Sequence, residues 1–187
     1  MSVFSKIKSY FKKEEPPKTY DFIWKYIDID QSLIEEIKDI YLKNIKKDLT
    51  GTRFFQTLPI KVPNVLGQKV NQCSLIYSSA GFNHNYCHKD VLYASDVKSL
   101  LALNIPFKNC GNSETKFYKD SEKNKHVFIG DMLSEVSPLD EANKISSYVL
   151  DKPILFETQI LHAVFNYSDQ PRVAISLRFE KNPVEWI

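Results

Sequence analysis

Two stretches, Ile154-Leu-Phe-Glu-Thr-Gln-Ile-Leu-His162 and Arg172-Val-Ala-Ile-Ser-Leu-Arg-Phe179, decide the fold that we expect for this chain. Both are rich in β-branched, aliphatic and aromatic residues, and the polar segment Asn166-Tyr-Ser-Asp-Gln-Pro171 lies between them. This pattern predicts two strands that are joined by a turn. A histidine ends the first predicted strand, and an arginine begins the second.

A second motif, His88-Lys89-Asp90, lies upstream of these strands. On an extended chain, residues two apart point to the same face, so His88 and Asp90 are expected to lie together. With a third ligand they would offer two imidazoles and one carboxylate, a set that leaves coordination positions open and suits non-haem Fe(II). Taken alone, His88 and Asp90 fit a surface turn, in which the carboxylate orients the imidazole, better than a metal site, and His162 alone fits a hydrogen-bonded core histidine.

The ordered set of His88, Asp90, His162 and Arg172 resembles the Fe(II)/2-oxoglutarate-dependent oxygenase superfamily. The resemblance is to small members related to prolyl and aspartyl/asparaginyl hydroxylases and to phage-type oxygenases, and it covers roughly residues 73–179. It implies that His88, Asp90 and His162 are catalytic residues that hold Fe(II). It also implies 2-oxoglutarate as co-substrate and O2 as oxidant, with ascorbate as a reductant.

Two arginines are candidates for binding the co-substrate. Arg172 would hold the distal carboxylate of 2-oxoglutarate, because a guanidinium forms two parallel hydrogen bonds with a carboxylate and stays charged when buried. The alternative for Arg172 is an ion pair with Asp169 or Glu157. Arg178 lies six residues further on, so strand alternation places it on the same face as Arg172. In similar DNA-repair dealkylases a second arginine at about this place also serves the co-substrate, so Arg178 is a candidate to contact either the co-substrate or the substrate.

Three further polar residues are candidates for the same cavity. Tyr77 resembles the tyrosine that precedes the iron motif in prolyl hydroxylases and donates its hydroxyl to the co-substrate, although any buried tyrosine needs a partner for its hydroxyl. Asn104 and Thr115 are polar residues within apolar strand-like segments. A buried polar group requires a partner, which a ligand in the cavity or the neighbouring backbone could provide.

Length and composition restrict the class of protein. A chain of 187 residues with a formal net charge of +2 suits a single domain, here residues 19–187, and its balanced charge argues against nucleic acid as a partner. The three cysteines lack a CxxC spacing, which favours a reducing compartment, so we expect a cytoplasmic protein. No apolar run reaches the length of a transmembrane segment.

The segment 1–18 is expected to form an amphipathic helix followed by a linker, since apolar residues recur at helical spacing beside lysines and two prolines follow. Such a helix either packs on the domain or contacts a partner or a membrane surface peripherally. A second helix is predicted from Leu33 to Lys47, as a support under a sheet. From Arg53 onward, short apolar segments alternate with turn residues, which is typical of sandwiches and barrels.

We therefore expect a mainly β protein, a double-stranded β-helix (jelly roll, cupin-like) with N-terminal supporting helices. The expected function is that of a dioxygenase that hydroxylates a C–H bond of a peptide side chain, an amino acid or a small metabolite, with release of succinate and CO2. One alternative is a catalytically silent cupin-like binding or structural protein, and another is a metal-dependent cupin enzyme that does not use 2-oxoglutarate. A zinc site built from His84, Cys87 and His88 would lack the fourth ligand of a closed site.

Overall fold

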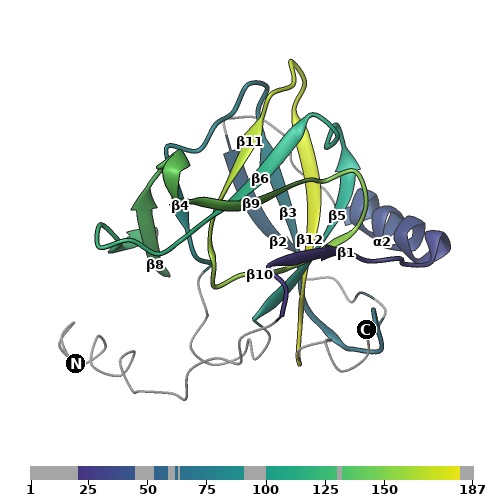
Figure 1. Ribbon diagram of the computed structural model, residues 1–187. Helices are drawn as coiled ribbons and strands as arrows, with labels where there is room; N and C mark the ends of the chain where they lie inside the picture. Colours follow the sequence, from purple (N-terminus) through teal and green to yellow (C-terminus); the bar gives the residue numbers. More distant parts are fainter. Residues whose placement is uncertain are drawn as a thin grey trace, which may run out of the picture.

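The computed structural model describes residues 21–44, 53–58, 62, 64–90, 100–129 and 132–181. Within these ranges, two antiparallel sheets of six strands each form a jelly-roll sandwich (Figure 1). This architecture confirms the fold class that the sequence predicts. The helix that we expect within residues 1–18 lies outside the described residues.

Strands that are neighbours in each sheet are mostly not consecutive in the chain. The first sheet contains β1 (Trp24–Tyr26), β10 (Ile154–Glu157), β5 (Leu101–Lys108), β12 (Arg172–Phe179), β3 (Val70–Ser78) and β2 (Arg53–Leu58), in that order. The second sheet contains β7 (Lys125–Ile129), β8 (Met132–Pro138), β4 (Tyr86–His88), β11 (Leu161–Asn166), β6 (Ser113–Tyr118) and β9 (Lys144–Val149), with a 3-10 turn η1 (Glu141–Asn143) before β9. The consecutive strands β10, β11 and β12 thus alternate between the two sheets.

The single strand predicted from Ile154 to His162 is wrong. The chain forms β10 in the first sheet, turns at 158–160, and continues as β11 in the second sheet, so that His162 lies near the start of a strand. The backbone N–H and the hydroxyl of Thr158 both donate to the carbonyl of Leu100, each at 2.9 Å. This turn is difficult to predict from the sequence, because residues 158–160 include neither glycine nor proline.

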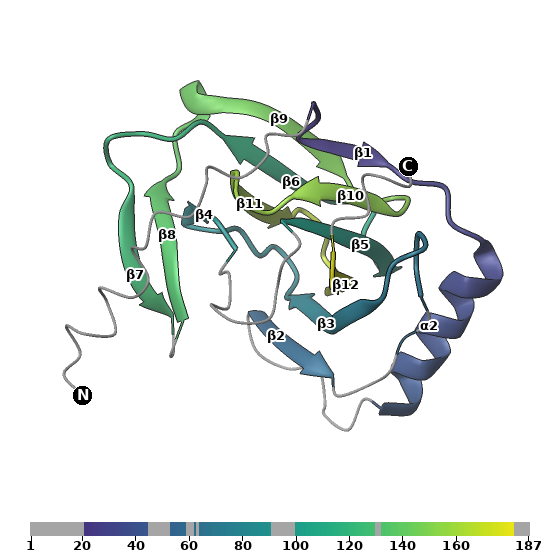
Figure 2. The same ribbon diagram turned by 90° about the horizontal axis from the view of Figure 1, so that it is seen from below.

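The helix α2 (Gln31–Asn44) covers the outer face of the first sheet (Figure 2). Asp30 precedes it and accepts a hydrogen bond from the backbone N–H of Ser32 at 2.7 Å, which satisfies a free donor of the first turn. Its buried residues Ile34, Ile37 and Tyr41 pack into the same apolar cluster as strands β3, β5 and β12. No helix in the described ranges has both the length and the apolar character that crossing a membrane requires.

The alternation along β12 separates an apolar face from a polar one. Val173, Ile175, Leu177 and Phe179 are buried in the cluster that α2 covers. The intervening residues Arg172, Ala174, Ser176 and Arg178 therefore point between the two sheets. Since small and polar side chains fill this space incompletely, the interior of the sandwich retains a cavity beside β12.

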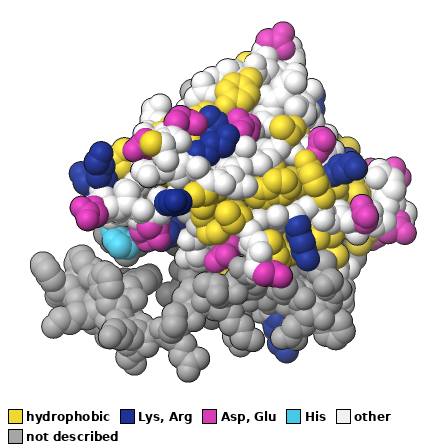
Figure 3. Space-filling model, viewed as in Figure 1, with side chains coloured by type: hydrophobic (Ala, Val, Ile, Leu, Met, Phe, Trp, Pro, Cys, Tyr) yellow, Lys and Arg dark blue, Asp and Glu magenta, His cyan; other side chains and the backbone are white. Residues whose placement is uncertain are grey.

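One side of the sandwich is closed where β1 and β9, edge strands of different sheets, meet. The indole Nε1 of Trp24 donates to the Ser146 hydroxyl at 2.7 Å, and the Tyr26 hydroxyl donates to the Val149 carbonyl at 3.3 Å. Figure 3 shows hydrophobic side chains gathered across this face, where Tyr26 and Val149 are partly exposed. These contacts connect the two sheets without a shared ladder of backbone hydrogen bonds.

Candidate metal centre

The pairing of β4 with β11 brings two distant histidines together. His88 and His162 lie directly opposite each other in this ladder, and their ring centroids are 4.7 Å apart. Asp90 follows β4, where its backbone N–H donates to the Thr158 carbonyl at 3.0 Å and its carbonyl accepts from Gln159 Nε2 at 3.0 Å. The turn between β10 and β11 thus holds the segment that carries Asp90 beside His162.

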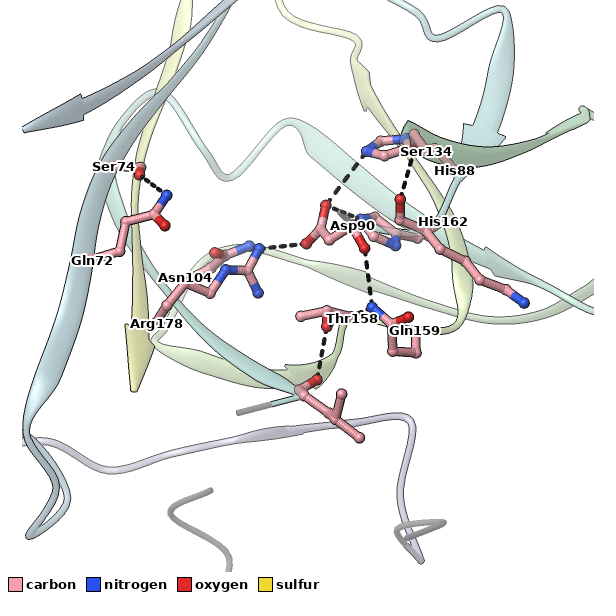
Figure 4. A network of polar contacts seen from close by, with 12 residues as sticks. Gln72, Ser74, His88, Asp90, Asn104, Ser134, Thr158, Gln159, His162 and Arg178 are labelled. Carbon is pink, nitrogen blue, oxygen red and sulfur yellow. Dashed lines mark hydrogen bonds and ion pairs between the residues drawn. The ribbon is translucent and has the colours of Figure 1, made fainter. Parts of the chain in front are cut away.

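The Asp90 carboxylate uses its two oxygens differently (Figure 4). Oδ1 lies 3.6 Å from Nε2 of His88 and 3.6 Å from Nε2 of His162, whereas Oδ2 is paired with the Arg178 guanidinium. Burial alone would raise the pKa of Asp90, but the Arg178 guanidinium outweighs this effect and the pKa lies well below its usual value. Asp90 is therefore an ionised carboxylate at neutral pH.

The hydrogen bonding of His162 leaves its inner nitrogen available as a ligand. Its Nδ1 lies 2.9 Å from the Ile160 carbonyl, and a carbonyl can only accept, so Nδ1 carries the proton and Nε2 keeps its lone pair. One ligand atom from each of His88, Asp90 and His162 lies within 4.8 Å of the others. Two imidazole nitrogens and a carboxylate oxygen fit a divalent transition metal with coordination positions left open, the donor set of non-haem iron.

The structure does not bring His84 and Cys87 into a zinc site with His88. His84 Nδ1 accepts from the Val164 backbone N–H at 3.0 Å, and Cys87 Sγ donates to the Ser137 carbonyl at 3.3 Å. Among the described residues, His88, Asp90 and His162 form the only group of three or more histidine, cysteine or acidic residues that could hold a metal ion.

Lys89, between the two ligands of the motif, attaches this segment to the β7–β8 hairpin. Its Nζ lies 2.9 Å from Asp120 and 3.2 Å from Glu135, and its backbone N–H donates to the Glu135 carbonyl. Its own carbonyl accepts from the Ser134 hydroxyl at 3.0 Å. Burial lowers the pKa of Lys89, but the two acids more than offset this and raise it.

A cavity of about 50 Å³ extends from the three candidate ligands between the sheets. It is lined by Ile76, His88, Asp90, Asn104, Thr115, Tyr148, Phe156, His162, Val164, Arg172, Ser176 and Arg178. The residues of β12 that line it are polar, whereas Ile76 on β3, Phe156 on β10 and Val164 on β11 add apolar surface from both sheets. The cavity therefore combines a candidate metal site with cationic groups on one side.

Arg172 is buried in this cavity with 1% of its surface exposed and forms no ion pair with a described carboxylate. Neither Asp169 nor Glu157, the partners considered from the sequence, pairs with it. Its Nε donates to the Ser113 hydroxyl at 3.0 Å, and its Nη1 has no hydrogen-bond partner among the described residues. Because a buried charge without an opposite charge is costly, this guanidinium is suited to an anionic ligand.

The structure brings most of the candidate co-substrate residues to the cavity, but not Tyr77. Tyr77 pairs with Val173 on β12, and both belong to the apolar cluster on the opposite face of the first sheet. Strand alternation accounts for this placement, since Tyr77 is one residue out of phase with Ile76, which lines the cavity. Asn104, Thr115 and Arg178 do line it.

Two polar lining residues, Tyr148 and Ser176, are not among the residues that the sequence predicts for the cavity. Ser176 lies between Arg172 and Arg178 at even spacing, so alternation along the predicted strand could have identified it. It is opposite Asn104 in the β12–β5 ladder, and its hydroxyl and Asn104 Oδ1 have no hydrogen-bond partner among the described residues. Nothing in Ser146-Ser-Tyr-Val149 distinguishes Tyr148 from other strand tyrosines.

Comparison with known proteins finds similarity in structure only. No protein-family model matches the sequence, and no curated protein matches it. Among solved structures, the chain is similar to the non-heme alpha ketoglutarate dependent carbocyclase SnoK from nogalamycin biosynthesis, with a TM-score of 0.50 and 9% identity over 84% of this chain and 79% of that one.

Two further solved structures match with lower TM-scores. A Pseudomonas putida prolyl-4-hydroxylase matches with a TM-score of 0.44 and 12% identity, over 84% of this chain and 92% of that one. A cupin domain from Bordetella pertussis matches with a TM-score of 0.33 and 12% identity, over 68% and 93% respectively. From its sheet topology and its similarity to the SnoK structure, the chain has a jelly-roll, double-stranded β-helix fold.

Proposed function

We propose that this protein is an Fe(II)- and 2-oxoglutarate-dependent dioxygenase that hydroxylates a C–H bond of a peptide side chain, an amino acid or a small metabolite. The observation that carries this proposal is the buried guanidinium of Arg172. It has no described carboxylate partner, and it lines the same cavity as the three candidate ligands. A ligand that chelates the metal at one end and bears a carboxylate at the other satisfies both groups at once.

Each residue of the centre has a defined task in this reaction. His88 and His162 would supply Nε2 and Asp90 would supply Oδ1 to the metal, while Arg178 engages Oδ2 of Asp90. The Ile160 carbonyl keeps His162 in the tautomer that a metal needs. When bound, iron with 2-oxoglutarate supplies the activation of O2, with release of succinate and CO2.

The remaining lining residues bind and shield the co-substrate. Arg172 donates to its distal carboxylate, and the apolar side chains of Ile76, Phe156 and Val164 limit the access of water to the methylene chain. The three cysteines are buried and unpaired, which supports a reducing compartment such as the cytoplasm. The balanced net charge supports a substrate other than nucleic acid.

The test is an anaerobic titration of the Fe(II)-loaded protein with 2-oxoglutarate, followed by the appearance of a visible charge-transfer band. We expect the band with the wild type and with His126→Ala, which alters an exposed histidine on β7. Arg172→Met should weaken 2-oxoglutarate binding at least tenfold and leave Fe(II) affinity within about threefold. His162→Ala should abolish the band because Fe(II) is no longer held.

Turnover is measured separately as succinate formed from 2-oxoglutarate in the presence of Fe(II), O2 and ascorbate. A wild-type protein that binds Fe(II) but shows no affinity for 2-oxoglutarate would overturn the proposal. That result would favour a cupin metalloenzyme that uses no 2-oxo acid. Absence of metal binding as well would favour a cupin with a binding role alone.

A further inference from the structure

The turn at residues 158–160 contacts two of the three candidate metal ligands (Figure 4). The backbone N–H of Asp90 donates to the Thr158 carbonyl, and the Asp90 carbonyl accepts from Nε2 of Gln159, each at 3.0 Å. The next residue, Ile160, accepts from Nδ1 of His162 at 2.9 Å. Three consecutive residues thus determine how Asp90 lies relative to His162.

The side chain of Gln159 is itself held in place. Its Nε2 carries two hydrogens, of which one points to the Asp90 carbonyl and the other to the Thr158 hydroxyl, at 3.4 Å. The Thr158 hydroxyl donates in turn to the carbonyl of Leu100, which directly precedes β5. A chain of hydrogen bonds therefore runs from the start of β5 through Thr158 and Gln159 to the backbone of Asp90.

The segment that carries Asp90 is held from both sides. The backbone N–H and carbonyl of Lys89 bond to Glu135 and Ser134 of β8, whereas those of Asp90 bond to the turn. All four backbone groups are thus satisfied within the protein. The donor to the Asp90 carbonyl is a side chain, so one substitution at Gln159 removes it and leaves the backbone hydrogen bonds in place.

The position of the Asp90 backbone decides where its carboxylate can reach. A single methylene separates the two, so a displacement of the backbone moves Oδ1 by a similar amount. Oδ1 lies 3.6 Å from Nε2 of His162. With metal–ligand bonds of about 2.1 Å, two neighbouring ligand atoms of one ion lie about 3 Å apart, so a small displacement is enough to lose one ligand. Arg178 engages the carboxylate itself, and Gln159 engages the backbone behind it.

We propose that Gln159 is a positioning residue of the metal centre, which holds the backbone of Asp90 where Oδ1 and the Nε2 of His162 can bind the same ion. This inference rests on the metal centre of the proposed function and does not depend on 2-oxoglutarate. A hydrogen bond that only stabilises the fold is lost equally from the metal-free and metal-bound forms, so its loss leaves the dissociation constant of the metal unchanged. Loss of a positioning bond changes that constant.

The test measures the Mn(II) dissociation constant of the full chain by anaerobic calorimetry. Gln159→Met keeps the length of the side chain but removes the donor, and it should weaken Mn(II) binding about 3- to 10-fold. Gln170→Met is the matched control, since Gln170 is an exposed glutamine between β11 and β12, and it should change the constant less than about twofold. Urea denaturation of the metal-free proteins measures the structural effect of each substitution separately.

A second pair of variants tests the anchor of the Gln159 amide. Thr158→Val keeps the shape of the side chain but removes the hydroxyl, so it should also weaken Mn(II) binding, whereas Thr158→Ser keeps the hydroxyl and should bind as the wild type does. The visible spectrum of the Co(II)-loaded protein reports the geometry of the ligands. It should differ from the wild-type spectrum in Gln159→Met and match it in Gln170→Met.

The outcomes separate this inference from the proposed function. If Gln159→Met lowers the stability of the metal-free protein but leaves the Mn(II) constant and the Co(II) spectrum unchanged, Gln159 is structural and the inference is wrong. A wild type that binds no Mn(II) would overturn both. If the wild type binds Mn(II) but not 2-oxoglutarate, and Gln159→Met still weakens Mn(II) binding, the inference holds and the proposed function fails.

Discussion

The guanidinium of Arg178 is paired with Oδ2 of Asp90, so that only Oδ1 of this carboxylate faces the two histidines. Arg178 lies on β12 of the first sheet, whereas Asp90 follows β4 of the second sheet, so a contact between the two sheets orients this candidate ligand. Partners of this kind determine how a ligand presents its lone pairs, and their loss typically weakens metal binding 10- to 100-fold.

Arg178→Met is therefore expected to weaken Fe(II) or Mn(II) binding about 10- to 100-fold, because Asp90 loses the partner that orients it. Anaerobic calorimetry measures the affinity. Lys69→Met is the control, as it removes a cation from the exposed pair of Lys69 with Glu180, close in sequence to Arg178. An affinity unchanged by Arg178→Met would show that the pair does not position the ligand.

Metal binding should stabilise the fold, because the donor set is assembled only when β4 and β11 are paired. At a free metal concentration 100 times the dissociation constant, we expect an increase of about 2.7 kcal/mol in the free energy of unfolding. Denaturant unfolding with and without Mn(II) measures it, and a chelator should reverse it. Asp90→Asn should lose the increase, whereas His126→Ala should retain it.

Lys89→Met should destabilise the protein by about 1–2 kcal/mol, since Asp120 and Glu135 would lose a largely buried cation between them. Urea denaturation gives the difference. The exposed pair of Lys69 and Glu180 again provides the comparison, and Lys69→Met should cost less than about 0.5 kcal/mol. Equal effects of the two variants would mean that the Lys89 pairs add nothing beyond surface ion pairs.

Glu157→Gln should make the protein more stable at neutral pH. Burial raises the pKa of Glu157 in the folded state, and it forms no ion pair among the described residues. When the pKa of an acid is higher in the folded state than in the unfolded state, the unfolded state ionises first as the pH rises. The free energy of unfolding therefore falls between the unfolded pKa of about 4.3 and the higher, folded pKa. The gain from Glu157→Gln should therefore be present at pH 7.5 and absent near pH 4 in urea denaturation.

Glu114→Gln, in contrast, should make the protein less stable at neutral pH. Burial raises the pKa of Glu114, but hydrogen bonds from Ser147 and Lys144 outweigh this and lower it. The wild-type carboxylate then contributes stability above its unfolded pKa, and this contribution disappears as pH falls through the lower, folded pKa. If both glutamine variants shifted the free energy of unfolding in the same direction at pH 7.5, the opposite pKa shifts inferred for Glu157 and Glu114 would be wrong.

The sequence predicts the fold class and the three candidate metal ligands better than it predicts how the strands connect. Alternation in Arg172 to Phe179 correctly separates a polar from an apolar face, because a strand has a side-chain period of two. The turn at 158–160 was missed because no glycine or proline interrupts Glu157-Thr-Gln-Ile160. Tyr77 was selected by resemblance, and its phase relative to Ile76 could be judged only once the register of β3 with β12 was known.

Strand β12 lies between β3 and β5 in the first sheet, although it follows both by many residues in the chain. During synthesis, β3 and β5 leave the ribosome before β12. The strand edges that β12 will pair with therefore have no partner until the residues from Arg172 onward have also emerged. Unpaired edges of this kind can join with those of other chains. Such pairings over long sequence separations also form slowly. The chain should therefore be most prone to associate with other chains before β12 has been added to the first sheet.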